Sequence, residues 1–129
     1  MTEDSIFTKI IKGEIPSHKI YEDEKNLAFL DIKPVQPGQV LVVPKVQIGK
    51  FYELSDDDLT ALFRASKIIA VHMEKILGKR ITLHIEGIDV QNHTHVKLIP
   101  ANTGEELRAL PQDASQEELA VMAAKLRIE

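Results

Sequence analysis

Three basic side chains, those of His93, His95 and Lys97, occupy alternate positions in one short segment. Successive side chains of an extended strand point to opposite faces, so the spacing predicts that all three share one face. Thr94, Val96 and Leu98, which alternate with them, are then expected to point to the other face, which can pack on a helix. Neutral imidazole is a nucleophile toward phosphorus, and a row of basic groups attracts an anion. The segment is therefore predicted to bind a phosphate group. One of its histidines could then attack the phosphorus.

The same pattern has two other interpretations. Two histidines on a strand are often part of a partly solvated sheet face with no chemical role. A His-x-His pair also suits zinc, for which His84 or Asp89 could supply a third ligand. Nothing in the sequence fixes the distance from these two residues to His93 and His95. A metal-binding protein is therefore the weakest hypothesis, and no metal is predicted.

Composition and charge narrow the class of protein. The 129 residues are 43% hydrophobic and 28% charged, with a formal net charge of −4 and no cysteine, which is typical of a soluble globular chain. The acidic balance argues against a general nucleic-acid binder, and the lack of cysteine excludes disulfides and thiolate chemistry. No apolar run approaches the ~20 residues of a membrane span, and the N-terminus lacks the apolar core of an export signal. We expect one domain over residues 1–129 and a cytoplasmic location.

The segments around the basic strand are predicted to form short helices and strands, and capping residues mark the ends of several of them. Ser55 before three aspartates is a helix N-cap, Gly78 is a helix stop, and Ser115 with Glu118 forms a capping box. The expected elements are a helix at 6–11, strands at 19–22, 27–31 and 40–43, a helix from 55 to 78, strands at 80–85 and 90–99, a loop at 101–114 and a helix from 115 onward. Strands follow one another in runs, which favours an α+β fold with an antiparallel sheet and helices on one face.

Several separate motifs resemble the histidine-triad (HIT) family. The segment from His93 to Pro100 is similar to the family signature, in which three histidines are separated by single apolar residues. The other matching segments are residues 5–16, Tyr21-Glu22-Asp23, residues 27–32 and residues 37–45. The resemblance thus runs from about residue 5 to about residue 100, in matching order. It implies a two-layer fold on a five-stranded antiparallel sheet, and a homodimer in which two sheets join.

The resemblance also implies a role for each matching residue. By this likeness His95 is the nucleophile that attacks the α-phosphorus of a nucleotide, and His93 orients it. Asp31 matches the acid that binds the ribose hydroxyls, which agrees with the ability of a carboxylate to accept two such donors. The residues that match the clasp around the base are Ile6, Phe7, Ile10, Phe29 and Ile32. Without the motifs, core packing would be the simpler interpretation of the apolar residues, and a turn carboxylate that of Asp31.

The sequence departs from the family pattern at the third triad position, where Lys97 replaces histidine. Lysine is a cation at neutral pH that can neutralise phosphate charge, but it is a poorer proton shuttle than imidazole. A lysine at a strand rim can also simply extend to solvent. The loop before His93 is short, and alternation puts Gln91 on the face of His93, as the candidate for the phosphate contacts that a longer loop supplies in many members.

A second departure concerns the structural zinc that some members bind. Ser5 and Thr8 stand where those members have cysteines, and Gln47 stands where a histidine often follows the Pro-Lys pair. Hydroxyl and amide groups are poor zinc ligands, so no structural zinc is predicted.

Two functional hypotheses from different classes follow. The first is a phosphoramidase or hydrolase that acts on purine nucleoside monophosphate conjugates, with adenosine preferred, through a nucleotidyl-histidine intermediate on His95. The second is a nucleotide-binding module with weak or no turnover, because of Lys97 and the short loop. The retained His95 favours the enzyme. No cofactor is expected, and the predicted partners are a small nucleotide and a second copy of the chain, with neither nucleic acid nor membrane.

Overall fold

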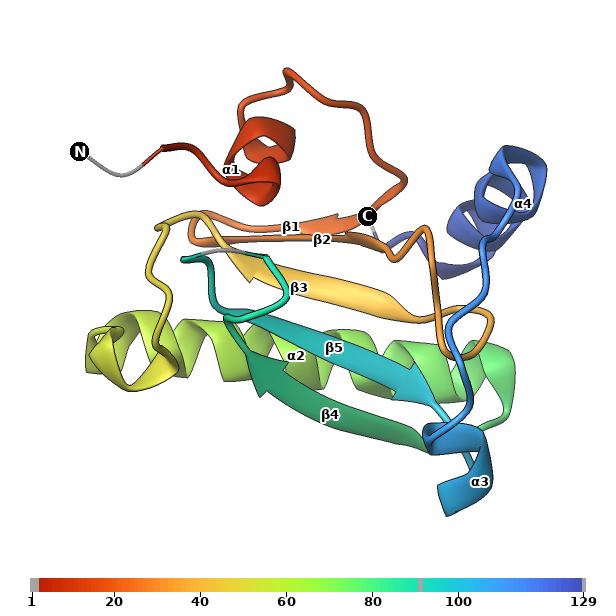
Figure 1. Ribbon diagram of the computed structural model, residues 1–129. Coiled ribbons are helices and arrows are strands. Elements are labelled where there is room, and N and C mark those ends of the chain that lie inside the picture. The colour runs from red at the N-terminus through yellow and green to blue at the C-terminus, as the bar shows by residue number, and fades with distance from the viewer. Residues whose placement is uncertain (1–2, 91, 129) are drawn as a thin grey trace.

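The computed structural model describes residues 3–90 and 92–128 of the chain, and its centre is a five-stranded sheet of order β1-β2-β3-β5-β4 (Figure 1). Every neighbouring pair of strands is antiparallel. The strands are β1 (Lys19–Glu22), β2 (Asn26–Leu30), β3 (Val40–Pro44), β4 (Ile81–Glu86) and β5 (His95–Pro100), and the helices are α1 (Ile6–Ile11), the 3-10 helix η1 (Phe51–Glu53), α2 (Asp56–Leu77), α3 (Gly104–Leu107) and α4 (Gln116–Leu126). The expected α+β class and the antiparallel five-stranded sheet are confirmed.

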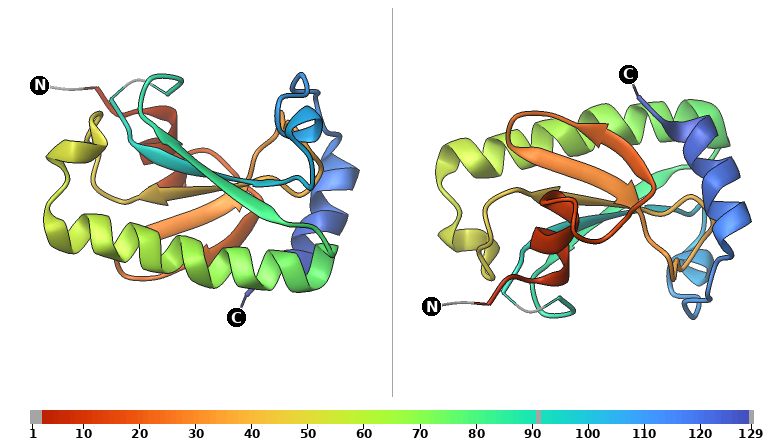
Figure 2. Two further views of the ribbon diagram at one scale, coloured as in Figure 1. Left: turned by 90° about the horizontal axis from the view of Figure 1, so that it is seen from below. Right: turned by 90° about the horizontal axis from the view of Figure 1, so that it is seen from above.

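Helices cover both faces of the sheet, and each face carries its own apolar cluster. The long helix α2 runs along one face, where it packs on alternate residues of the central strands, among them Val42, Val96 and Leu98 (Figure 2). The prediction that Val96 and Leu98 pack on a helix is confirmed. Helix α1 lies on the opposite face, because Phe7 joins a separate apolar cluster with residues such as Phe29. The expectation that all helices share one face is therefore wrong for α1.

The helix ends follow the local signals of the sequence. The side chain of Ser55 accepts a hydrogen bond from the Asp58 amide, and Gly78 ends α2 in the left-handed region at φ 68°. Ser115 and Glu118 form the reciprocal capping box at the start of α4. None of the helices in the described part of the chain combines the length and the apolar content that crossing a membrane demands.

The largest difference from the predicted elements is the start of β5. The strand begins at His95 and not at residue 90, since the chain turns before it and Asn92 takes a positive φ of 58°. The His93 amide donates to Val90 O, and the Thr94 amide donates to Ile48 O rather than to a neighbouring strand. Helix α3 occupies part of the expected loop at 101–114, where the hydroxyl of Thr103 caps it.

Candidate active site

A cavity of about 680 Å³ opens on the face of the sheet that carries α1. Its wall includes most of the residues singled out from the sequence, namely Ile6, Phe7, Ile10, Phe29, Asp31, Ile32, His95 and Lys97. His93 lies buried behind the wall and does not line the cavity. The predicted phosphate contact Gln91 lies outside the described residues. The fold thus brings the α1 residues, the end of β2 and strand β5 together around one space.

His95 is only 1% exposed, and both of its ring nitrogens face oxygen atoms. Its Nδ1 lies 3.0 Å from the carbonyl oxygen of His93, and its Nε2 lies 2.9 Å from Oε1 of Glu86. A carbonyl only accepts, so Nδ1 carries a proton and donates it there. In the neutral ring the free lone pair then belongs to Nε2. The Phe7 ring packs edge-on against the imidazole at 4.9 Å between centroids, which fixes the plane of the ring.

His93 precedes strand β5, and its backbone carbonyl accepts the hydrogen bond from His95 Nδ1. Its Nε2 donates to Pro44 O at 2.8 Å, and its Nδ1 accepts from the Ser5 hydroxyl at 2.6 Å. Burial lowers the pKa of His93, against the opposing effect of the Pro44 hydrogen bond, so the ring stays neutral near pH 7. The prediction that His93 is part of the strand is wrong, because β5 begins at His95. The ring of His93 nevertheless faces α1 as the ring of His95 does, since both pack edge-on against Phe7.

Lys97 lies on the cavity side of β5, as the alternation predicts, but its ammonium group is engaged. Its Nζ lies 2.5 Å from Oδ2 of Asp89 and 3.6 Å from Oε1 of Glu86, and the side chain is 21% exposed. Burial works against its charge, yet the hydrogen bond and charge of Asp89, with further help from Glu86 and Asp31, hold the pKa of Lys97 above its ordinary value. The hydrogen bond and the charge of Lys97 in turn lower the pKa of Asp89.

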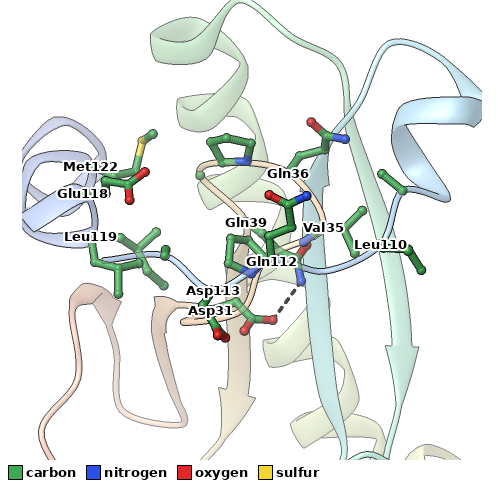
Figure 3. Close-up of a pocket in the computed structure, with 16 residues that line it drawn as sticks. Asp31, Val35, Gln36, Gln39, Leu110, Gln112, Asp113, Glu118, Leu119 and Met122 are labelled. Atoms are coloured by element: carbon green, nitrogen blue, oxygen red, sulfur yellow. Dashed lines mark hydrogen bonds between the residues drawn. The ribbon is translucent and has the colours of Figure 1, made fainter. Parts of the chain in front are cut away.

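Asp31 follows β2 and is held by two donors. The Lys33 amide donates to Oδ1 at 2.9 Å. The side-chain amide of Gln39 donates to Oδ2 at 2.9 Å, as the dashed line in Figure 3 shows. Gln39 is itself fixed, because it is 2% exposed and its Oε1 accepts from the Val35 amide. Burial raises the pKa of Asp31, against the hydrogen bonds from Lys33 and Gln39 and the charge of Lys97. The turn interpretation and the binding interpretation of Asp31 thus both have a structural basis.

A second cavity, of about 370 Å³, lies on the other side of Asp31. Figure 3 shows Asp31, Gln39, Gln112 and Asp113 gathered on one side of it, with Glu118, Leu119 and Met122 of α4 across the space. The segment between α3 and α4 therefore lines this second cavity together with Asp31, the candidate for ribose binding. Neither Gln39 nor Glu86 was identified from the sequence. Glu86 meets His95 only through the register of the β4–β5 pairing, which the structure reveals.

The apolar residues of the cavity divide into a floor and a rim. Phe7 and Phe29 are buried and meet edge to face at 5.6 Å between centroids, so core packing and cavity lining are both true of them. Ile6 and Ile32 are exposed at 50% and 63%, which is unusual for isoleucine and leaves an apolar rim open to solvent. A flat aromatic ligand would bury this rim.

A hydrogen-bonded cluster ties α1 to His93. The Ser5 hydroxyl caps α1 by accepting from the Thr8 amide while it donates to His93 Nδ1. Oε1 of Gln47 accepts from the Ser5 amide at 2.9 Å and from the Thr8 hydroxyl at 2.6 Å. The helix that supplies Phe7 is thereby fixed against the residue whose carbonyl holds His95.

The fold and the arrangement of these residues can be compared with known proteins. The HIT domain matches residues 12–103, so the chain belongs to the HIT family. It is 41% identical over 105 residues to an uncharacterized HIT-like protein of Methanocaldococcus jannaschii, which covers 78% of this chain and 81% of that protein. It is 37% identical over 99 residues to the adenosine 5'-monophosphoramidase hnt1 of Schizosaccharomyces pombe, which covers 74% of this chain and 72% of the relative.

Solved structures agree with this assignment. A Hit-like protein from Bartonella henselae superposes with a TM-score of 0.87 at 30% identity, covering 98% of this chain and 96% of the other. A zinc-bound histidine triad family protein from Mycobacterium smegmatis superposes with a TM-score of 0.76 at 27% identity, covering 94% of each chain.

The zinc of that relative raises the question of whether this chain can hold one. The hydroxyl and amide oxygens of Ser5, Thr8 and Gln47 already satisfy each other and His93, and none of them is a good zinc ligand. These residues do not fit a zinc ion. The hypothetical set of His93, His95 and His84 fits no better, since within the described residues no three His, Asp or Glu side chains are gathered as ligands.

Proposed function

We propose that this protein is a phosphoramidase or hydrolase that cleaves conjugates of purine nucleoside monophosphates, with adenosine as the preferred nucleoside. The observation that carries the proposal is the buried ring of His95, which lines the cavity while its Nδ1 is held by the His93 carbonyl. A fixed imidazole with its Nε2 lone pair free of a proton is a nucleophile. Relatives named as adenosine 5'-monophosphoramidases support the same substrate class.

The proposed reaction has two displacements at phosphorus. The base lies against Phe7 and Ile32, the ribose hydroxyls donate to Asp31, and the α-phosphorus meets Nε2 of His95. The new bond from Nε2 to phosphorus forms as the bond to the leaving nitrogen breaks, and the amine departs with that electron pair and takes a proton from solvent. Water then attacks phosphorus, the bond to Nε2 breaks, one water proton is lost to solvent, and the nucleoside monophosphate and neutral His95 are restored.

The direct test uses purified protein and an adenosine phosphoramidate. Release of adenosine monophosphate is followed by chromatography at neutral pH, with the uncatalysed hydrolysis measured in parallel. Release above the uncatalysed rate is the expected result. Its complete absence, in protein shown to bind adenosine monophosphate, would reject the enzyme.

That second outcome would favour the other candidate function, a nucleotide-binding module. We place Lys97 at the third position of the triad, and its ammonium is paired with Asp89 rather than free in the cavity. A lysine held in this way neither donates its proton readily nor accepts one. Tight binding of adenosine monophosphate without turnover is the result that distinguishes the module from the enzyme.

The role proposed for Asp31 predicts a specific pH dependence of binding. Only the ionised carboxylate accepts both ribose hydroxyls, and burial raises its pKa above the ordinary 3.8. The contribution of Asp31 to the affinity for adenosine monophosphate should therefore be constant above the raised pKa and fall as the pH drops through it. Replacing Asp31 with asparagine should weaken binding about tenfold at neutral pH.

Calorimetric titrations of wild type and Asp31→Asn between pH 4 and pH 8 check this prediction. The ratio of the two affinities removes the titration of the ligand's phosphate, which is the same in both experiments. The ratio should shrink toward one as the pH falls. A ratio that does not change with pH would show that Asp31 does not contact the ribose as a carboxylate.

We further propose that the protein is a homodimer. Strand β4 is an edge strand whose one neighbour among the described residues is β5, and open edges favour pairing with a second copy. Helix α2 also exposes apolar residues, of which Ile68 is 44% and Val71 64% exposed, while Ile69 and Met73 are part of the core. Light scattering at micromolar concentration should give twice the chain mass of 14.5 kDa, and a monomer mass would contradict the proposal.

A further inference from the structure

The carboxylate nearest to His95 belongs to Glu86, the last residue of β4 and the direct cross-strand neighbour of His95. Its Oε2 accepts from the backbone amides of Ile88 and Asp89, which fixes the carboxylate at the start of the loop. Its Oε1 is shielded from solvent, 2.9 Å from Nε2 of His95 and 3.6 Å from Nζ of Lys97. The mechanism above does not use this residue.

The position of Oε1 leaves the nucleophile open. Oε1 lies 2.9 Å from Nε2 without making a hydrogen bond, and we infer from this that the carboxylate lies beside the lone-pair direction of Nε2 and does not fill it. The cavity reaches His95, whereas Glu86 does not line it. A phosphorus atom in the cavity can therefore approach Nε2 while Glu86 stays in place.

Attack at phosphorus changes the charge of the ring that Glu86 faces. When Nε2 forms its bond to phosphorus while Nδ1 keeps its proton, the neutral imidazole becomes a cation. The excess positive charge lies in a buried ring, where a carboxylate at contact distance stabilises it strongly. The ring that attacks is neutral, because Nε2 must offer its lone pair, so the effect of the carboxylate is greater in the intermediate and in the transition state that leads to it than before the attack.

We propose that Glu86 is a positioning residue that acts through His95 and stabilises the cationic nucleotidyl-histidine, which deepens and rests on the proposed function. Its charge also acts on the substrate, because the phosphate is an anion that approaches the same ring. Lys97 partly offsets this repulsion, and Asp89 on the loop adds to it. Glu86 therefore opposes binding of the phosphate in the ground state and favours its transfer.

These two effects have opposite signs, and this gives the proposal its test. The variant Glu86→Gln keeps the size of the side chain and an oxygen that can accept from the Ile88 and Asp89 amides, but it removes the charge. We expect kcat for an adenosine phosphoramidate to fall about 10- to 100-fold. We expect adenosine monophosphate to bind equally well or several-fold more tightly. A merely structural role would weaken binding and turnover together.

Two further variants make the comparison specific. Glu86→Asp keeps the charge at a greater distance and should have a kcat between those of wild type and Glu86→Gln. Glu22→Gln removes a carboxylate at the end of another strand, one that pairs with Lys19 and Lys45 outside the cavity, and should match the wild type. Far-ultraviolet circular dichroism and thermal midpoints establish that all variants are folded.

The outcomes separate this inference from the proposed function. If the wild type releases no adenosine monophosphate, the proposed function fails and the role of Glu86 fails with it. If the wild type is active and Glu86→Gln has the same kcat, only the role of Glu86 is overturned. Lower kcat together with weaker binding of adenosine monophosphate in a folded Glu86→Gln protein would also overturn it, because the effect would then be structural.

Discussion

Replacing His95 with alanine should slow the release of adenosine monophosphate from an adenosine phosphoramidate by about 10⁴-fold or more. The reason is that the variant lacks the nitrogen that forms the covalent bond, while the rest of the cavity remains. Nucleotide binding should persist, because Phe7, Phe29 and Asp31 are unchanged and surround the nucleoside in the proposed pose. Initial rates by chromatography and affinities by calorimetry measure the two quantities separately.

The matched control is His84→Ala. His84 is exposed and lies on β4 opposite Lys97, so it is a histidine in the same region that has no part in the proposed reaction. Its variant should retain the wild-type rate. In the wild type, incubation with substrate and quenching in denaturant at alkaline pH, where a nitrogen–phosphorus bond survives, should in addition yield protein whose mass is increased by a nucleotidyl group, and His95→Ala should show none. Equal release of adenosine monophosphate by wild type and His95→Ala would remove His95 from the mechanism.

Replacing Gly87 with alanine should lower the free energy of unfolding by about 3 kcal/mol. A Cβ at this position would lie 2.0 Å from the carbonyl oxygen of Gly49 and 2.9 Å from its carbonyl carbon. Both are backbone atoms, so no side-chain rotation relieves the overlap and one of the two loops must move. Denaturant titration followed by circular dichroism measures the loss.

Gly13→Ala is the control for this variant. Gly13 has a φ of 81°, so alanine there is strained, but a Cβ would meet no atom within 4 Å. It should therefore lose only about 1 kcal/mol from its conformation. Turnover should fall in Gly87→Ala and not in Gly13→Ala, because the loop at Gly87 directly follows Glu86 and carries Asp89. A loss in Gly87→Ala no larger than that in Gly13→Ala would mean that the two loops separate easily.

Elements whose ends are set by neighbouring residues could be predicted from the sequence. Helix α2 begins after Ser55 and ends at Gly78, as predicted, since a helix cap acts through hydrogen bonds within about one helical turn. The alternation of His95, Val96 and Lys97 was equally readable, because the two-residue period of a strand is a local property. The family followed from several motifs in matching order, and the comparisons confirm it.

Contacts between segments that are distant in the sequence bring together the groups that surround His95. Glu86 precedes His95 by nine positions, and the two meet because β4 and β5 pair in a register that places them opposite each other. Gln39 meets Asp31 in the same way, across the turn between β2 and β3. His93 left its predicted strand position because the Thr94 amide bonds to Ile48, far away in sequence. Strand register and loop contacts depend on packing between distant segments, which no local pattern encodes.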